Sequence, residues 1–484
     1  MGGIATAARL AKAGYDVTVL EKTPRPGGRA STIEENGFFF DIGPSLFLMP
    51  ATWRQTYADL GERLEDHLDL VQIDPTYRIH FSDGSMLDLS NDMVSMREQL
   101  DQIEPGSFEA LLRFLTQGYR RYYESLSRFV GRNFYSLAEY LSPANLPLLF
   151  SLKPLAKHYA DTSRYFRDAR LRAAFSFQNM YLGVSPYDAP ATYTLLQFTE
   201  LGEGVWYPRG GMYSAVKSLV GIAEGWGARF HYNTPVQRID VQQARAVGVT
   251  LGSGEQLRAD VVIANADLPY AYEHLLPDQA EAERLKRLQY TSATLMFYWG
   301  LKAERSPALL HHNVFLSDHR YRESFERIFR DHTLPDEPSF YIHAPVRTVP
   351  TFAPQDSDAL MVLVPTGHIA EGQTQDWTAL QQRAREWVTR RLSALGIQDL
   401  AQRIVFERTL TPPDYLRTWN LAKGAAFGLG HNILQVGYLR PQNRHQRYRN
   451  LYFVGASTHP GTGLPIVLLS ARLVEERVRQ EQSL

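Results

Sequence analysis

The first 22 residues constrain the fold more than any other part of the chain. Gly2 and Gly3 open an uninterrupted run of helix-forming residues, which Gly14 stops, and a β-branched strand then ends at Glu21. This is the second half of a G-x-G-x-x-G turn, in which the backbone approaches a pyrophosphate at the positive N-terminus of a helix. An acid after the second strand binds ribose hydroxyls and disfavours NADP. The pattern therefore predicts a Rossmann-like nucleotide site at the first residues.

Two further segments support a nucleotide cofactor. Residues 24–30, PRPGGRA, can present backbone amides and the guanidinium of Arg29 to phosphate oxygens. Residues 37–45, GFFFDIGPS, place an aromatic strand before a glycine turn. This succession resembles the amine-oxidase-like FAD superfamily. The resemblance implies that Arg29 contacts the pyrophosphate and that the turn at Gly43 lies near the flavin.

The C-terminal 35 residues repeat the strand, turn and helix order. A buried strand over 451–454 runs into a turn that holds Gly455, Gly461 and Gly463, and Pro465 suits the first turn of a terminal helix. The free amides of such a helix can stabilise negative charge on the pyrimidine edge of a reduced flavin. The alternative is an ordinary amphipathic helix after a turn. The crowding of glycines favours a site that needs close backbone approach.

Six motifs in the same order along the chain resemble those of the bacterial-type phytoene desaturase family, which includes the C30 diapophytoene desaturases. The motifs are Gly27-Gly28-Arg29, Phe40-Asp41-Ile42-Gly43-Pro44, Trp206 to Met212, Gly424 to Gly428, Arg440 to Asn443 and Gly455 to Gly461. The similarity covers nearly the whole chain. It implies FAD contacts from Gly2, Gly3, Glu21, Lys22, Gly28, Arg29, Gly43, Val236, Asn265, Asp267, Gly455, Gly463 and Ile466.

Family members begin with a short apolar strand and two more glycines before the position of Met1. We therefore expect the Rossmann-like domain to lack its first strand, which would remove an interior member of the parallel sheet. A start codon assigned too late is the favoured explanation. The other is a truncated chain, which we expect to bind FAD poorly.

The resemblance and the motif positions predict an α/β fold with two interleaved domains. Strands expected near 229–236 and 261–264 return the chain to the nucleotide fold, and residues 245–258 alternate around Gly252-Ser253-Gly254 as a hairpin. The expected discontinuous FAD-binding domain comprises residues 1–75, 205–270 and 445–484. The expected α+β substrate-binding domain comprises residues 76–204 and 271–444.

Residues 111–175 form a basic, helical stretch within a chain of net charge -1. The stretch carries eleven lysines and arginines against four acids, and it contains the apolar segment 143–152. Basic residues around a short apolar segment suit an interfacial helix beside anionic lipid, whereas a buried helix with a charged outer face is the competing interpretation. The sequence alone supports the interfacial helix and the buried helix equally. The lipid substrate implied by the resemblance favours the interfacial helix. We therefore expect a cytoplasmic protein at the inner face of the cell membrane.

Composition excludes several other chemistries. The chain has no cysteine, so thiolate nucleophiles, disulfides and a cysteinyl flavin link are absent. The fourteen histidines show no H-E-x-x-H or comparable spacing, so no metal site is predicted. No G-x-S-x-G elbow with partners suggests a hydrolase. A net charge of -1 gives no general attraction to nucleic acid, and none is expected as a partner.

The resemblance implies an FAD-dependent oxidoreductase that introduces conjugated double bonds into phytoene or diapophytoene. The substrate loses a hydride to the flavin and a proton from the neighbouring carbon, and oxygen or a membrane quinone then accepts the electrons. Thr458, His459 and Thr462 of the C-terminal turn are the catalytic candidates. A related FAD-dependent carotenoid oxygenase, or an isoprenoid-binding protein without redox activity if the chain is truncated, are the alternatives.

Overall fold

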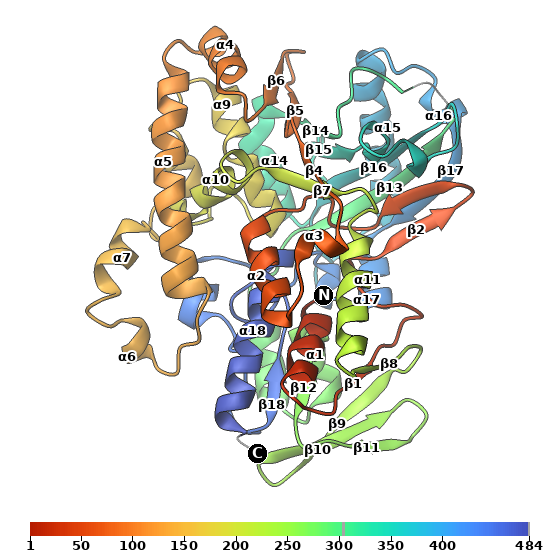
Figure 1. Cartoon of the computed structure of the whole chain (residues 1–484). Coiled ribbons are helices and arrows are strands. Elements are labelled where there is room, and N and C mark those ends of the chain that lie inside the picture. Colours follow the sequence, from red (N-terminus) through yellow and green to blue (C-terminus); the bar gives the residue numbers. More distant parts are fainter. Residues whose placement is uncertain (303–304, 483–484) are drawn as a thin grey trace.

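Two pairs of short parallel strands lie with the first and last helices in the lower half of Figure 1. The computed structural model describes residues 1–302 and 305–482. The pairs are β1 (Thr18–Leu20) with β8 (Arg229–His231) and β12 (Val262–Ala264) with β18 (Leu451–Phe453). Within the described residues these pairs are separate sheets. Helix α1 (Gly2–Lys12) packs against α18 (Leu464–Glu481) and α11 (Tyr213–Gly225), so the two ends of the chain form one layer.

The local predictions for the chain ends are confirmed. Helix α1 covers the expected run, and Gly14 follows it with a φ of 92°, a left-handed conformation that glycine adopts without strain. Helix α18 contains Pro465 in its first turn, as the sequence indicated. The hairpin expected over 245–258 is formed by β10 (Arg245–Leu251) and β11 (Gln256–Arg258), and β9 (Val236–Gln242) completes that sheet.

A seven-stranded, mostly antiparallel sheet forms the second layer. Its order is β17, β13, β16, β15, β14, β5 and β6, with β14 parallel to β5. All nine residues of β13 are buried because both faces of the sheet are covered. Leu295 and Trp299 face α15 (Trp377–Ala394), while Met296 and Tyr298 face the layer of α1. The strands are β5 (Tyr77–His80), β6 (Met86–Leu89), β13 (Ala293–Leu301), β14 (His312–Phe315), β15 (Phe340–His343), β16 (Asp358–Thr366) and β17 (Ile404–Leu410).

A group of helices covers one side of this sheet, at the left of Figure 1. It comprises α4 (Met93–Ile103), α5 (Ser107–Ser125), α6 (Leu137–Tyr140), α7 (Leu146–Ser151), α8 (His158–Thr162), α9 (Ala169–Ala174) and α10 (Leu195–Leu201). A fully buried ion pair of 2.8 Å between Arg121 and Asp161 joins α5 to α8. The apolar segment expected to lie at an interface forms α7. Across the described residues, no helix is both long enough and apolar enough to cross a membrane.

The remaining elements connect these layers. The strand pairs β2 (Thr32–Glu35) with β3 (Phe38–Asp41) and β4 (Leu70–Ile73) with β7 (Val205–Pro208) are antiparallel. The remaining α-helices are α2 (Pro50–Leu60), α3 (Leu64–His67), α12 (Leu268–Tyr270), α13 (Gln279–Lys286), α14 (Tyr321–Phe329), α15 (Trp377–Ala394), α16 (Leu400–Arg403) and α17 (Pro412–Trp419).

Candidate functional site

One cavity of about 2200 Å³ runs from the N-terminus of α1 to the seven-stranded sheet and the helical group. Its walls come from segments that lie far apart in the sequence. Every residue predicted to bind the cofactor or to act in catalysis lines it: Gly2, Gly3, Glu21, Lys22, Gly28, Arg29, Gly43, Val236, Asn265, Asp267, Gly455, Thr458, His459, Thr462, Gly463 and Ile466. The structure therefore brings all of these residues to one space, and their individual roles remain predictions.

Glycines hold the backbone close to side chains at the α1 end of the cavity. The Gly3 amide donates to Asn265 Oδ1 at 3.0 Å, and a Cβ on Gly3 would lie only 2.7 Å from that oxygen. Asn265 in turn donates through Nδ2 to the Val454 carbonyl at 2.7 Å, so it joins α1 to the end of β18. A Cβ on Gly43 would lie 2.7 Å from the Arg29 carbonyl. Larger residues at these positions would push the walls apart.

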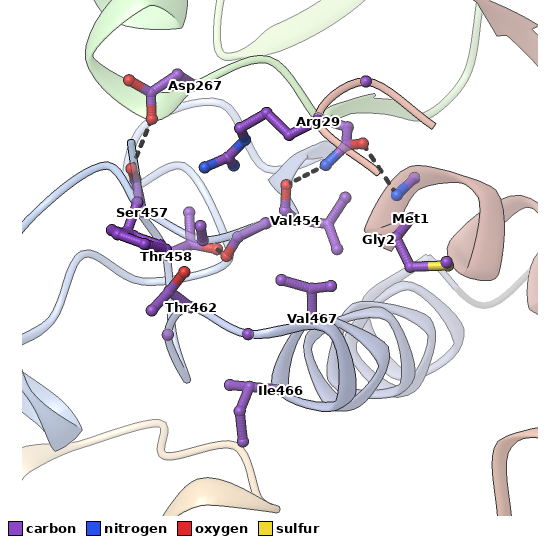
Figure 2. A pocket seen from close by; sticks show the side chains of 18 of the residues that line it. Met1, Gly2, Arg29, Asp267, Val454, Ser457, Thr458, Thr462, Ile466 and Val467 are labelled. Carbon is purple, nitrogen blue, oxygen red and sulfur yellow. Dashed lines mark hydrogen bonds between the residues drawn. The ribbon is translucent and has the colours of Figure 1, made fainter. Parts of the chain in front are cut away.

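A half-buried cation, Arg29, and a half-buried carboxylate, Asp267, lie near each other across the cavity (Figure 2). The Arg29 guanidinium donates to the Ala426 carbonyl, and burial lowers its pKa while Asp267 opposes that shift. Asp267 accepts from Ser457 Oγ at 2.6 Å and from the Ala422 amide at 3.1 Å. Burial raises the pKa of Asp267, against these hydrogen bonds and the Arg29 charge. The Arg29 guanidinium and the Asp267 carboxylate therefore give this end of the cavity one positively charged and one acidic group in fixed positions.

The residues after β1 are held by neighbouring loops. The Glu21 carboxylate accepts from both the amide and the hydroxyl of Thr23 at 2.8 Å. Lys22 Nζ donates to Asn420 Oδ1 at 2.7 Å, so Lys22 ties β1 to the end of α17. Val236 is the first residue of β9. Glu21 therefore presents an oriented carboxylate at the edge of the sheet, where the sequence pattern expects a ribose contact.

The C-terminal turn lies directly before α18, and its residues line the cavity. Gly455 and Gly463 have φ angles of 137° and 108°, which L side chains rarely adopt. Thr458 Oγ1 donates to the Gly455 carbonyl at 3.2 Å, and the Thr462 amide donates to His431 Nε2 at 3.3 Å. His459 Nε2 donates to the Arg132 carbonyl at 3.0 Å, and burial lowers the pKa of His459 to about 4.

Sequence reasoning assigned no role to Arg440, although the residue lay in one of the recognised motifs. Its fully buried guanidinium donates to carbonyls of two loops, with distances of 3.0 Å to Thr458, 3.0 Å to Gly430 and 2.9 Å to Gln435. A third nitrogen contact reaches the Ala456 carbonyl at 2.5 Å. Arg440 therefore holds the C-terminal turn against the loop that follows β17 and α17. A buried arginine is not visible in sequence unless its partners are known.

A cluster of three histidines behind the cavity wall was not predicted from the sequence. His311 and His312 of the β14 end and His343 of β15 are buried, and their ligand-capable nitrogens lie within 4.8 Å of one another. No metal was predicted because the motif spacings are absent. The cluster arises because β14 and β15 pair so that His312 lies opposite His343. Sequence spacing cannot reveal such a pairing.

The residues at the α1 end fit an FAD cofactor. Backbone amides at the start of a helix, glycines that leave no room for a Cβ, an arginine and an acid after β1 are the groups that bind a dinucleotide. Figure 2 shows Gly2, Arg29, Thr458 and the first turn of α18 around the same space.

Comparison with solved structures shows the fold. A putrescine oxidase bound to putrescine aligns with a TM-score of 0.64 and 15% identity, covering 100% of this chain and 97% of that one. An oxidoreductase from Methanosarcina mazei aligns with a TM-score of 0.59 and 16% identity, covering 98% of both chains. The mixed α/β architecture is therefore that of the FAD-dependent amine oxidase fold.

Comparison with curated relatives is more specific. The model of the family "Flavin containing amine oxidoreductase" matches residues 1–478. A zeta-carotene-forming phytoene desaturase from Myxococcus xanthus is 48% identical over 480 residues, which is 99% of this chain and 92% of that protein. A 4,4'-diapophytoene desaturase from Staphylococcus haemolyticus is 32% identical, covering 99% of this chain and 97% of its own. The chain therefore belongs to the flavin-containing amine oxidoreductases, among the carotenoid desaturases, with FAD as the cofactor.

Proposed function

We propose that this protein is an FAD-dependent desaturase of phytoene. One observation carries the proposal: a single cavity joins the glycine-lined cofactor end to a lobe lined by apolar side chains of the helical group and the seven-stranded sheet. Phe177, Met180, Leu196, Phe325 and Leu363 lie in that lobe. Such a lobe suits a long hydrocarbon. The relatives favour desaturation over both oxygenation and binding without redox chemistry.

FAD, when bound, supplies the acceptor for the hydride that leaves the substrate. The chain's own residues bind the cofactor, orient the hydrocarbon and exclude water. The amides at the start of α18 can stabilise negative charge on the cofactor. The apolar lobe holds the hydrocarbon without hydrogen bonds, so the position of the hydrocarbon along the cavity is set by the shape of the lobe.

The substrate is proposed to be the C40 phytoene rather than the C30 diapophytoene. The phytoene desaturase from Myxococcus xanthus is 48% identical to this chain, and the diapophytoene desaturase from Staphylococcus haemolyticus is 32% identical. The test is expression in cells that make one or the other hydrocarbon, followed by mass spectrometry of the pigments. Loss of hydrogen pairs from phytoene alone supports the proposal. Gain of oxygen, or no change in either background, contradicts it.

The division into domains is proposed to follow the sheets. The parallel pairs take their strands from 1–75, 205–270 and 445–484, the segments that we assign to FAD. The seven-stranded sheet takes all its strands from 76–204 and 271–444, which we assign to the substrate.

We propose that the helical group docks on the membrane at the mouth of the cavity. Tyr140, Leu149, Leu152, Leu434 and Leu439 line the cavity at this end. The side chains around it include large exposed apolar ones: Leu137, Leu141, Leu146, Leu155, Leu434 and Leu439, with Leu155 84% and Leu434 71% exposed. Solitary exposed leucines are ordinary, but a group of them beside an apolar cavity indicates an interaction surface.

The basic residues of 111–175 supply the second component of this docking, because lysine and arginine near a surface are attracted to anionic lipid. Flotation with vesicles tests the proposal. Binding to vesicles that contain anionic lipid, weaker at high salt, supports a peripheral location at the inner face of the cell membrane. Protein that stays in the soluble fraction with every vesicle contradicts it. Reoxidation rates under oxygen or with an added quinone distinguish the two electron acceptors.

A further inference from the structure

Desaturation must remove a proton as well as a hydride, and the proton needs an acceptor at the cavity wall. This inference rests on the proposed function. The residues of the C-terminal turn are poorly placed for the task. Thr458 Oγ1 already donates to the Gly455 carbonyl, and His459 Nε2 donates to the Arg132 carbonyl, which leaves Nδ1 as the one basic atom of an imidazole that is only 3% exposed.

The opposite wall carries a different arrangement. Ser45 follows the turn at Gly43, and Tyr341 lies on β15; both line the cavity. Ser45 Oγ and Tyr341 Oη are 2.8 Å apart. His312 Nδ1, on the neighbouring strand β14, lies 2.6 Å from the same phenol oxygen. In the part of the chain that the structure describes, Tyr341 is the one cavity-lining tyrosine hydrogen-bonded to an imidazole nitrogen.

Behind Tyr341 the contacts continue away from the cavity. His312 Nε2 is buried and has no hydrogen-bond partner among the described residues. The rings of His311 and His343 lie beside it, with centroids 4.4 Å and 5.5 Å from that of His312. His311 Nε2 and His343 Nε2 are 3.0 Å apart, and His311 Nδ1 lies 2.6 Å from Thr348 Oγ1. His312 is therefore a buried base whose hydrogen bond among the described residues is the one to Tyr341.

We propose that Tyr341 and His312 form a relay that accepts the proton lost by the substrate. The C–H electron pair of the carbon next to the hydride donor becomes the new C=C bond, and its proton binds Tyr341 Oη. The phenol proton passes at the same time to His312 Nδ1, which becomes an imidazolium, so Tyr341 ends as a neutral phenol. Ser45 donates to Tyr341 Oη and orients it. After the product has left, the proton returns from His312 Nδ1 through Tyr341 Oη to water that enters the cavity.

The protonation states suit this direction of transfer. Burial and the neighbouring imidazoles hold the pKa of His312 well below its usual value, so the ring is neutral and ready to accept. Burial raises the pKa of Tyr341, so the phenol keeps a proton to pass on. A carbon acid beside an electron-poor centre is far stronger than an imidazolium, and the transfer is therefore downhill. Tyr341 is the catalytic residue, while Ser45 is a positioning residue.

The test compares Tyr341→Phe, His312→Gln and the double variant with the wild type, all loaded with FAD and supplied with phytoene in vesicles. Each single variant should lower kcat by about 10²–10⁴, as expected when a positioned acid or base is lost. KM should change little, because the phenol ring and the cavity remain. The double variant should be no slower than the slower single variant, since both substitutions break the same relay. The solvent deuterium isotope effect on kcat should disappear in each.

Tyr57→Phe is the matched control, because the Tyr57 hydroxyl is also hydrogen-bonded to a serine, Ser218, at 2.9 Å, but Tyr57 lies outside the cavity. It should leave kcat and the isotope effect as in the wild type. Flavin content and melting temperature, measured for every variant, identify a variant that has merely failed to fold. Ser45→Ala, which keeps the relay but removes the orienting hydroxyl, should give a smaller loss of kcat.

Three results would overturn the relay. In an active wild type, kcat of Tyr341→Phe equal to that of Tyr57→Phe would remove the phenol from the reaction. Losses that multiply in the double variant would make the two residues independent. The third result is one equivalent of a divalent metal in the wild type that is lost in His312→Gln. A metal on His312 Nε2 would leave His312 Nδ1 protonated, as a hydrogen-bond donor instead of an acceptor. By contrast, a folded, flavin-loaded wild type that removes no hydrogen from phytoene would overturn the proposed function itself.

Discussion

The two ends of the cavity are built in different ways. At the cofactor end, the backbone lies close to its neighbours, and Gly3, Gly43 and Gly455 are needed because a Cβ would meet Asn265 or Arg29 at 2.7–3.2 Å. At the substrate end, the wall is apolar, and its polar atoms belong to buried side-chain groups such as Tyr341 with His312. We therefore expect the cofactor end to lose its shape when a side chain is enlarged. We expect the substrate end to lose its function when one partner of a buried hydrogen bond is removed.

The largest expected effect comes from the side chain that joins the loops of the C-terminal turn. Arg440→Leu leaves the carbonyls of Thr458, Gly430, Gln435 and Ala456 buried without their donor. We expect a loss of about 3–5 kcal/mol in the free energy of unfolding, measured by urea denaturation. Arg449→Leu at an exposed position is the control and should change the stability by less than about 0.5 kcal/mol. Equal stability of the two variants would contradict a structural role for Arg440.

The next effect tests the cofactor end. Gly43→Ala places a methyl group against the Arg29 carbonyl, and overpacking of this kind costs about 1–3 kcal/mol. We expect the dissociation constant of FAD to rise by about 10-fold to 100-fold, measured by flavin fluorescence on titration. Gly221→Ala is the matched control because a Cβ there meets no atom within 4 Å. Unchanged FAD affinity in Gly43→Ala would show that the backbone turn is not part of the cofactor site.

A buried carboxylic acid at the substrate end predicts a pH dependence. Burial raises the pKa of Glu200 to about 8, although Tyr77 and Gln178 donate to it at 3.2 Å. Because the folded pKa lies above the unfolded value, the stabilisation is complete below about pH 4.5 and is lost as the pH rises towards 8.

Glu200→Gln, which stays neutral, should therefore gain stability relative to the wild type across this window. We expect the difference in the free energy of unfolding to change by about 3 kcal/mol between pH 5 and pH 8. The exposed Glu255→Gln is the control and should follow the wild type. A constant difference between Glu200→Gln and the wild type over this range would mean that Glu200 is ionised throughout.

The smallest expected effect concerns the membrane. Leu155→Ser removes an apolar side chain that is 84% exposed. We expect weaker partitioning into anionic vesicles, by a factor of a few, with flavin content and turnover on dispersed substrate unchanged. Val405→Ser is the control, because Val405 is 55% exposed on β17, outside the helical group. Equal partitioning of the two variants would place the docking surface elsewhere.

The cofactor end could be predicted from the sequence because its requirements are local. Gly3, Gly43 and Gly455 stand in short motifs whose spacing is set by one turn and one helix, and the family resemblance supplied the order of those motifs. Helices α1 and α18, strand β18 and the hairpin of β10 and β11 followed from the same local patterns. These predictions needed no knowledge of distant contacts.

The substrate end could not be predicted in this way. Tyr341 meets His312 only because β15 pairs with β14, and it meets Ser45 across a sequence separation of 296 residues. Glu200 and Arg440 are charged residues that a sequence pattern would place at the surface, yet both are buried among specific partners. Histidine spacing suggested no cluster, since His343 joins His311 and His312 through sheet register.

The packing of α1 against α18 has a consequence for biosynthesis. Helix α1 is synthesised long before β18 and α18, against which the N-terminal part of the chain packs. The wall around Gly3 is complete only after both Asn265 and Val454 have been made. Domains whose contacts are local can fold during synthesis, but this one must keep its apolar first helix soluble until its partner arrives. Capture of the flavin therefore has to wait until Asn265 and Val454 have joined α1.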